Sequence, residues 1–186
     1  LSFNSCYSLK SIDIPDSVTF IDAYAFEECT SLTSCTIGSG VTSIGISAFD
    51  RCSGLTGIDI PDSVTSIVNY AFLYCSGLTS CTLGSSVTTI GDYAFYSCSG
   101  LTSIDIPNGV TTIGDYVFAL CSSLESIDIP NSVTSIGEHA FFHCTSLTNC
   151  TIGSGVTRIA NSVFSSCHSL TSVTIPSSVV TIGNYA

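Results

Sequence analysis

The stretch "LTSIDIPNGVTTIGDYVFALCSS", residues 101–123, decides the fold because its pattern restarts every 23 residues along the chain. Aligned, the units read L-x-x-(I/C/V)-x-(I/L)-(P/G)-x-x-V-x-x-I-x-x-x-(A/V)-F-x-x-C-x-x, and no insertion or deletion breaks the register. Full units start at residues 9, 32, 55, 78, 101, 124 and 147, with partial units over 1–8 and 170–186. A repeat of this length is typical of a solenoid, in which stacked coils share a core. We therefore expect one solenoid segment over 1–186, cut within a coil at both ends.

Each unit is expected to form one coil. The L-x-x-I-x-I run alternates and then meets proline in five units, where a strand should stop because proline cannot donate to a ladder. The A-F-x-x-C stretch has the spacing of one helical turn. We therefore expect a strand, a turn, an irregular V-x-x-I side and a short helical turn in every coil. Strands of successive coils should pair in parallel, about 4.8 Å apart.

Composition excludes several classes of function. The net charge is −11, with only three basic residues. Such a surface repels phosphate backbones and anionic lipid, so nucleic acid is not an expected partner. No apolar run approaches the roughly 18 residues of a membrane span, so we expect no membrane insertion within this segment. The chain starts with Leu1 rather than Met, which indicates a mature segment or a piece of a longer chain.

The chain has eleven cysteines. Numbering each unit from its leading leucine, eight of them occupy position 21 and three replace isoleucine at position 4. In-register stacking would place the position-21 Cβ atoms nearly as far apart as the Cα atoms, beyond the usual ~3.8 Å of a disulfide. No C-x-x-C pair occurs. We therefore expect free thiols packed in the core, with one or two disulfides or a metal site as the alternatives.

The pattern "LTSIDIPDSVTSIGxxAFxxCxx" resembles the BspA-like class of leucine-rich repeat over essentially the whole chain. The resemblance implies a right-handed leucine-rich-repeat solenoid, with a parallel β-sheet on the concave face and short helical turns on the other side. It also implies a surface protein of a host-associated bacterium or protozoan, linked to adhesion and to binding host proteins. The family pattern carries no catalytic residues and no cofactor site.

Two outward surfaces are candidates for binding a partner. The first is the position-5 row of the concave face, which suits a basic partner and is extended by Asp16 and Asp62 at position 8. The alternative is that these acids only keep the strand face soluble. The second is an apolar patch on the helical side, where the alternative is that tyrosines lie flat and shield the core. The candidate residues are Asp13, Asp59, Asp105 and Asp128 for the first surface, and Leu73, Tyr96, Leu120 and Phe142 for the second.

Two weaker patterns concern metal ions. His139 and His143 are four residues apart, a spacing that suits two ligands on a helix, but no third ligand accompanies them. Asp92, Asp115 and Glu138 recur at position 15 and could hold Ca²⁺ if they stack. Both patterns are explained equally by a polar ladder along the coils, so we predict neither a metal nor a cofactor.

These observations favour a non-catalytic protein-binding or adhesion module of a cell-surface or secreted protein, which binds a host or extracellular macromolecule through several coils. The alternative is an intracellular, cytoplasmic protein-interaction scaffold, which reduced cysteines also fit. An enzyme would need convergent acids and bases in a cleft, and this regular surface offers none. Because neither end carries a polar capping unit, we also expect end-to-end self-association.

Overall fold

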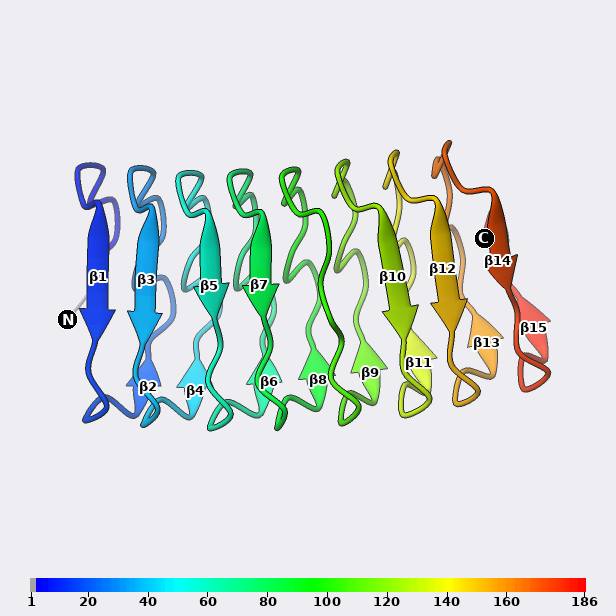
Figure 1. The fold of residues 1–186 in the computed structure, drawn as a ribbon, viewed down its shortest axis with the longest axis horizontal. Helices are drawn as coiled ribbons and strands as arrows, with labels where there is room; N and C mark the ends of the chain where they lie inside the picture. The colour runs from blue at the N-terminus through cyan, green and yellow to red at the C-terminus, as the bar shows by residue number, and fades with distance from the viewer. Residues whose placement is uncertain (1–2) are drawn as a thin grey trace.

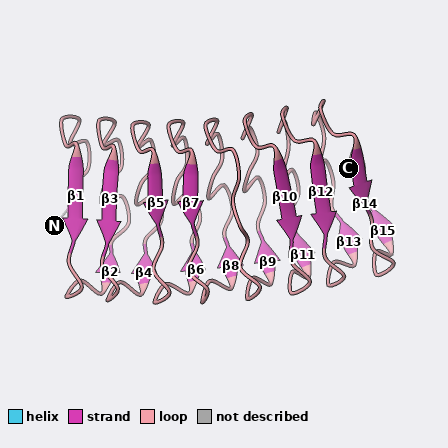
Figure 2. Cartoon of the chain, viewed as in Figure 1, coloured by secondary structure: helices cyan, strands magenta, loops and turns pink. Residues whose placement is uncertain are grey.

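The computed structural model describes residues 3–186 as a continuous stack of coils (Figure 1). The first two residues of the partial unit expected over 1–8, Leu1 and Ser2, lie outside the described residues. The coils contribute parallel strands to two sides of the stack, joined by turns, except that the coil starting at Leu101 contributes to one side only (Figure 2). The predicted repeat solenoid is confirmed.

The longer strands form what we call the strand face, the side predicted to be concave. Each strand covers positions 3–6 of its unit or part of them, and neighbouring strands pair in parallel at a separation of 23 residues, as Ser11 does with Ser34. The strands are β1 (Ser11–Ile14), β3 (Ser34–Ile37), β5 (Gly57–Asp59), β7 (Ser80–Thr82), β10 (Ser126–Ile129), β12 (Asn149–Ile152) and β14 (Ser172–Thr174). They form two sheets, β1-β3-β5-β7 and β10-β12-β14. The coil that starts at Leu101 lies between the two sheets and has no strand on this face.

A second parallel ladder runs through positions 12 and 13, where we expected an irregular segment. That expectation is wrong, because in-register stacking lets even two residues per coil bond to the coil before and after. The strands are β2 (Phe20–Ile21), β4 (Ser43–Ile44), β6 (Ser66–Ile67), β8 (Thr89–Ile90), β9 (Thr112–Ile113), β11 (Ser135–Ile136), β13 (Arg158–Ile159) and β15 (Thr181–Ile182). The four strands β6, β8, β9 and β11 form one uninterrupted sheet.

The predicted helical turns are wrong, since no helix is present in residues 3–186. We call positions 14–23 of each unit the turn side. Within it, the residues at positions 16 and 20 have φ values of 54–64°. Alternate N–H groups donate to the next coil, as Tyr93 N does to Asp115 O (2.9 Å) and Ser97 N to Ala119 O (2.8 Å). Left-handed residues break a helix, and N–H groups bonded between coils cannot form an i→i−4 ladder. The A-F-x-x-C spacing therefore reflects a chain of turns.

The core is a column of stacked side chains along the solenoid. The position-18 phenylalanines, from Phe3 to Phe164, stack with centroid separations of 5.1–5.5 Å. Phe49, Phe72 and Phe95 are fully buried. Each coil thus covers the apolar side of its neighbours, which one coil could not bury alone.

All eleven cysteines are free, and ten of them are buried, as predicted. The position-21 thiols form no disulfide in the described residues. Instead, from Cys29 to Cys167, each Sγ donates a hydrogen bond to the phenylalanine carbonyl of the preceding coil, at 3.0–3.2 Å. The cysteines therefore link successive coils without a covalent bond.

Candidate interaction surfaces

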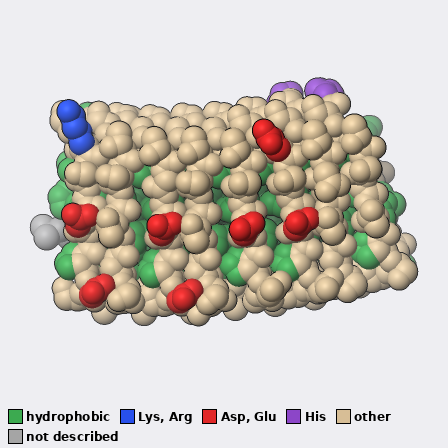
Figure 3. All heavy atoms as spheres, in the orientation of Figure 1, with side chains coloured by type: hydrophobic (Ala, Val, Ile, Leu, Met, Phe, Trp, Pro, Cys, Tyr) green, Lys and Arg blue, Asp and Glu red, His purple; other side chains and the backbone are tan. Residues whose placement is uncertain are grey.

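The position-5 row lies on the strand face as predicted. All four carboxylates, Asp13, Asp59, Asp105 and Asp128, are exposed, because alternation along a strand turns the flanking isoleucines inward. Figure 3 shows a row of acidic side chains crossing this face along the length of the stack. Within residues 3–186, none of the four makes a side-chain hydrogen bond or an ion pair. These carboxylates have no evident structural role.

The position-8 acids behave differently, although they also are exposed. Asp16 Oδ1 accepts hydrogen bonds from Ser39 N (2.7 Å) and Ser39 Oγ (3.0 Å). Asp62 Oδ1 accepts from Ser85 N (2.6 Å) and Ser85 Oγ (2.9 Å). The backbone and side-chain hydrogen bonds from Ser85 hold the pKa of Asp62 below its usual value. These two carboxylates connect successive coils, a structural role that the position-5 carboxylates lack, and their place in the binding row stays a prediction.

The position-15 acids form the polar ladder that was the alternative to a calcium site. Asp92 Oδ1 accepts from Asp115 N (2.9 Å), and Asp115 Oδ1 accepts from Glu138 N (2.7 Å). Glu138 Oε1 in turn accepts from Asn161 Nδ2 (2.7 Å). In the described part of the chain, no three His, Cys, Asp or Glu side chains are placed to hold a metal ion.

The two histidines proposed as a metal pair have different neighbours. His139 stacks on Tyr116, with ring centroids 4.5 Å apart. His143 lies edge-on to His168, with centroids 6.2 Å apart. The helix on which their spacing would have paired them is absent, so the basis of that hypothesis is removed.

The predicted turn-side patch is present but half-buried. Leu73, Tyr96, Leu120 and Phe142 occupy four successive coils, and all are partly covered. The Tyr96 ring lies 5.5 Å from Tyr93 and 5.6 Å from Tyr74.

The aromatic groups of the turn side also pack on one another. Position 16 forms a stack through Tyr70, Tyr93, Tyr116 and His139, with centroid separations of 5.3, 4.8 and 4.5 Å. The ring faces inside this stack are occupied by neighbouring rings, so much of the patch packs on itself.

Asp50, at position 19 of its unit, is a buried carboxylate on the turn side. Its residue is 4% exposed, Oδ2 lies 3.3 Å from Arg51 Nη1, and Oδ1 has no hydrogen-bond partner. Desolvation raises the pKa of Asp50 to about 6, with Arg51 opposing the shift and Glu27 and Glu28 adding to it. The position-19 column, in which Leu73, Tyr96 and Phe142 are part-exposed, gave no signal of this burial.

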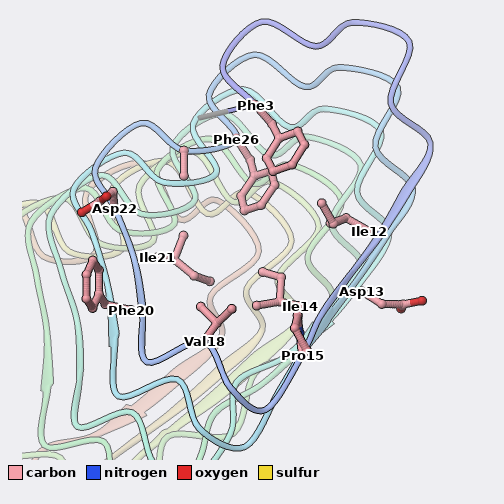
Figure 4. Close-up of a pocket in the computed structure, with 11 residues that line it drawn as sticks. Phe3, Ile12, Asp13, Ile14, Pro15, Val18, Phe20, Ile21, Asp22 and Phe26 are labelled. Carbon is pink, nitrogen blue, oxygen red and sulfur yellow. The ribbon is translucent and has the colours of Figure 1, made fainter. Parts of the chain in front are cut away.

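The N-terminal end of the described stack is an apolar depression of about 370 Å³. Figure 4 shows Phe3, Phe26, Ile14 and Ile21 pointing into it, while Asp13 points away. At the other end, Ile175 and Ile182 are 45% and 59% exposed. Core positions are thus uncovered at both ends of the described residues.

Parallel strands repeating every 23 residues over a leucine- and phenylalanine-lined core define a leucine-rich-repeat solenoid. The model of the BspA-type leucine-rich repeat region, in six copies, matches residues 1–123 and 65–186, and the chain belongs to this family. The repeat is typical of non-enzymatic protein-interaction scaffolds. No helix within residues 3–186 has the length and hydrophobicity that crossing a membrane requires.

Solved structures agree with this assignment. The leucine-rich repeat protein of T. pallidum is 29% identical with a TM-score of 0.81, over 88% of this chain and 77% of that one. A leucine-rich cell surface protein of Faecalibacterium prausnitzii is also 29% identical with a TM-score of 0.63, over 92% of this chain and 61% of that one. The pneumococcal vaccine antigen PcpA, 18% identical with a TM-score of 0.61 over 94% and 62%, shares the fold. None of the curated proteins compared with the sequence matches it significantly.

Proposed function

We propose that this chain is a protein-binding module of a cell-surface or secreted protein, and that it binds a basic region of a host or extracellular macromolecule through the strand face. The observation that carries the proposal is the contrast among the carboxylates. Those at positions 8 and 15 bond to the next coil, whereas the position-5 carboxylates are exposed and unpartnered. Groups without a structural role, repeated over several coils, suit a broad contact.

The surface location is supported by the relatives. The Faecalibacterium protein of similar sequence is described as a cell surface protein. The eleven free thiols favour the second candidate, an intracellular protein-interaction scaffold, because reducing compartments keep thiols free. Biotinylation of intact source cells separates the two: labelling of the protein supports the surface, and labelling only after lysis supports the scaffold.

Binding is tested with immobilised extracellular matrix proteins, comparing the parent with two variants. The strand-face variant carries Asp→Asn at positions 13, 59, 105 and 128, and the turn-face variant carries Leu73→Ser, Tyr96→Ser and Phe142→Ser. We expect the strand-face variant to lose binding, and the parent affinity to fall steeply with salt because exposed charges are screened.

A charge-matched control removes an equal number of negative charges at residues that lie away from the strand face. It carries Asp22→Asn, Glu27→Gln, Glu28→Gln and Glu138→Gln. It should bind like the parent. Loss only in the turn-face variant, with little salt dependence, would assign the contact to the aromatic side. Parent-like binding by every variant would make the segment a spacer.

A further inference from the structure

The strand face is interrupted at the coil that starts at Leu101. Residues 103–106 occupy the positions that form β5 and β7 in earlier coils, yet they make no backbone hydrogen bonds to either neighbour within the described structure. Figure 1 shows this coil crossing the strand face as an irregular segment between β7 and β10. The second ladder stays continuous through β8, β9 and β11, so only the strand face opens.

The sequence explains the opening between this coil and the next, because only here do two successive coils both have proline at position 7, Pro107 and Pro130. At the equivalent steps after Pro15, Pro61 and Pro130, the next coil has glycine at position 7, and there is little room for a side chain. A Cβ on Gly38 would be 2.6 Å from the Pro15 carbonyl carbon, and one on Gly84 would be 2.5 Å from Pro61 O. Pro130, which follows Pro107, carries a Cβ at that crowded position. The two coils therefore cannot close as the others do.

A missing side-chain bond acts in the same direction. Where a coil with proline at position 7 is followed by one with glycine, the Asp or Asn at position 8 accepts hydrogen bonds from a serine of the next coil. Asn131, for example, accepts from the backbone N–H and the hydroxyl of Ser154. Asn108 is instead followed by Asn131, and no such bond forms. On the opposite side, Thr102 N is 3.5 Å from Thr79 O, whereas the equivalent Thr79 N to Thr56 O distance is 2.9 Å. The coil is thus loosely held on both sides.

The opening leaves a groove with two depressions that share Asp105. One has a volume of about 500 Å³ and is lined by Leu83, Ile106 and Pro107, with Asp62 at its edge. The other, of about 280 Å³, lies between Asp105 and Asp128. No lysine or arginine lines either depression. The unpartnered carboxylates of Asp105 and Asp128 and the unpaired backbone groups of residues 103–106 thus lie beside the apolar side chains of Leu83, Ile106 and Pro107.

We propose that this groove seats an arginine or lysine side chain of an extended protein segment, as the anchor of the strand-face contact; this rests on the proposed function. A cationic side chain has donors and no acceptor, which complements the carboxylates of Asp105 and Asp128. These two acids occupy adjacent coils, whereas Asp13 and Asp59 each stand alone in the row. A guanidinium can bond to both carboxylates, and its aliphatic stem can lie over Ile106 and Pro107.

The probe is a fluorescent peptide, (Gly-Ser-Arg)4, with (Gly-Ser-Glu)4 as its charge control, and binding is read by fluorescence anisotropy in buffer containing EDTA. Two double variants remove equal charge from the same row. Asp105→Asn with Asp128→Asn should weaken binding about tenfold, and Asp13→Asn with Asp59→Asn by less than about threefold. A third variant, Pro130→Gly, places a glycine over Pro107 without changing charge; it should weaken binding and slow amide exchange at residues 103–106.

The outcomes separate the two proposals. If both double variants weaken binding equally and Pro130→Gly has no effect, the row acts as a uniform acidic surface; the groove is then refuted while the proposed function stands. If neither double variant weakens binding, both proposals fail. Peptide binding that is present in a parallel measurement without EDTA and absent with EDTA would assign the site to a metal ion and overturn the cationic anchor.

Discussion

The Sγ of Cys98 donates a hydrogen bond to the carbonyl oxygen of Phe72 in the preceding coil, at 3.2 Å. The same oxygen accepts the N–H of Cys75, also at 3.2 Å. Position 21 therefore needs a side chain that is small and apolar and that also carries a weak donor, and cysteine combines these properties. Each bond links one coil to the next, so the cysteine column reports directly on the stacking.

Thiol titration tests this column. Burial raises the pKa of Cys75 and of Cys98 well above the usual value, so neither forms the reactive thiolate near neutral pH. Only Cys6 is partly exposed. We expect about one or two thiols to react in the native protein, and all eleven after unfolding without reductant. A count of about five or fewer after unfolding would indicate disulfides and contradict the packing.

Asp50 should make stability depend on pH in the mildly acidic range. Its pKa is raised from 3.8 to about 6, so the native state keeps a proton that the unfolded chain releases. The free energy of unfolding should therefore fall as pH rises from about 4 to about 6. Asp50→Asn removes this loss and should stabilise the protein at pH 7 by about 1–3 kcal/mol in urea unfolding.

The control is Asp22→Asn, at an exposed carboxylate, which should leave the pH profile unchanged. If Asp50→Asn instead destabilises the protein at pH 7, the ion pair with Arg51 outweighs the desolvation of Asp50, and the account of this site is wrong.

The left-handed residues of the turn side are strained. Ser97 has φ = 59°, a conformation that glycine adopts without cost. Ser97→Gly should raise the free energy of unfolding by about 0.5–1 kcal/mol, because relief of strain exceeds the added entropy of the unfolded chain. Ser99 does not have positive φ, and Ser99→Gly should lower the free energy of unfolding by a similar amount. Equal effects at both positions would show that the turn side stores no such strain.

The uncovered ends should cause concentration-dependent association of the 186-residue chain. The apolar depression at one end and the exposed Ile175 and Ile182 at the other occupy the same core positions that stack inside the solenoid. Sedimentation should show larger species as concentration rises, and Ile175→Lys with Ile182→Lys should reduce them. A monomer at all concentrations, with terminal amides as protected as central ones, would argue against this.

The fold was predictable because a fixed 23-residue register determines which residues stack, whatever each short segment prefers alone. The second ladder and the missing helix were not predictable on that basis. Two-residue strands such as β9 are stabilised by neighbouring coils, and tyrosine or serine at a left-handed position carries no glycine-like signal. Local apolar spacing therefore suggested a helix that the bonds between coils prevent.

The candidate site was predictable only in part. Asp13 and Asp16 are three residues apart and look alike in sequence, but only Asp16 faces donors of the next coil. Residue type across coils gave no signal, because Asp16 and Asp62 are followed by serine after 23 residues, while Asp13 and Asp59 are followed by threonine, which also carries a hydroxyl donor. The burial of Asp50 depends on side chains of neighbouring coils, for which the repeat pattern gives no rule.

The central claim, that the unpartnered strand-face carboxylates form the binding surface, is tested most directly by zero-length carbodiimide cross-linking to the peptide (Gly-Ser-Lys)4. Mass spectrometry then identifies which carboxylates lie within reach of a bound lysine. We predict cross-links at Asp105 and Asp128, weaker ones at Asp13 and Asp59, and suppression of all four as salt rises. Cross-links that fall instead on Asp22, Glu27 and Glu28 would contradict the claim.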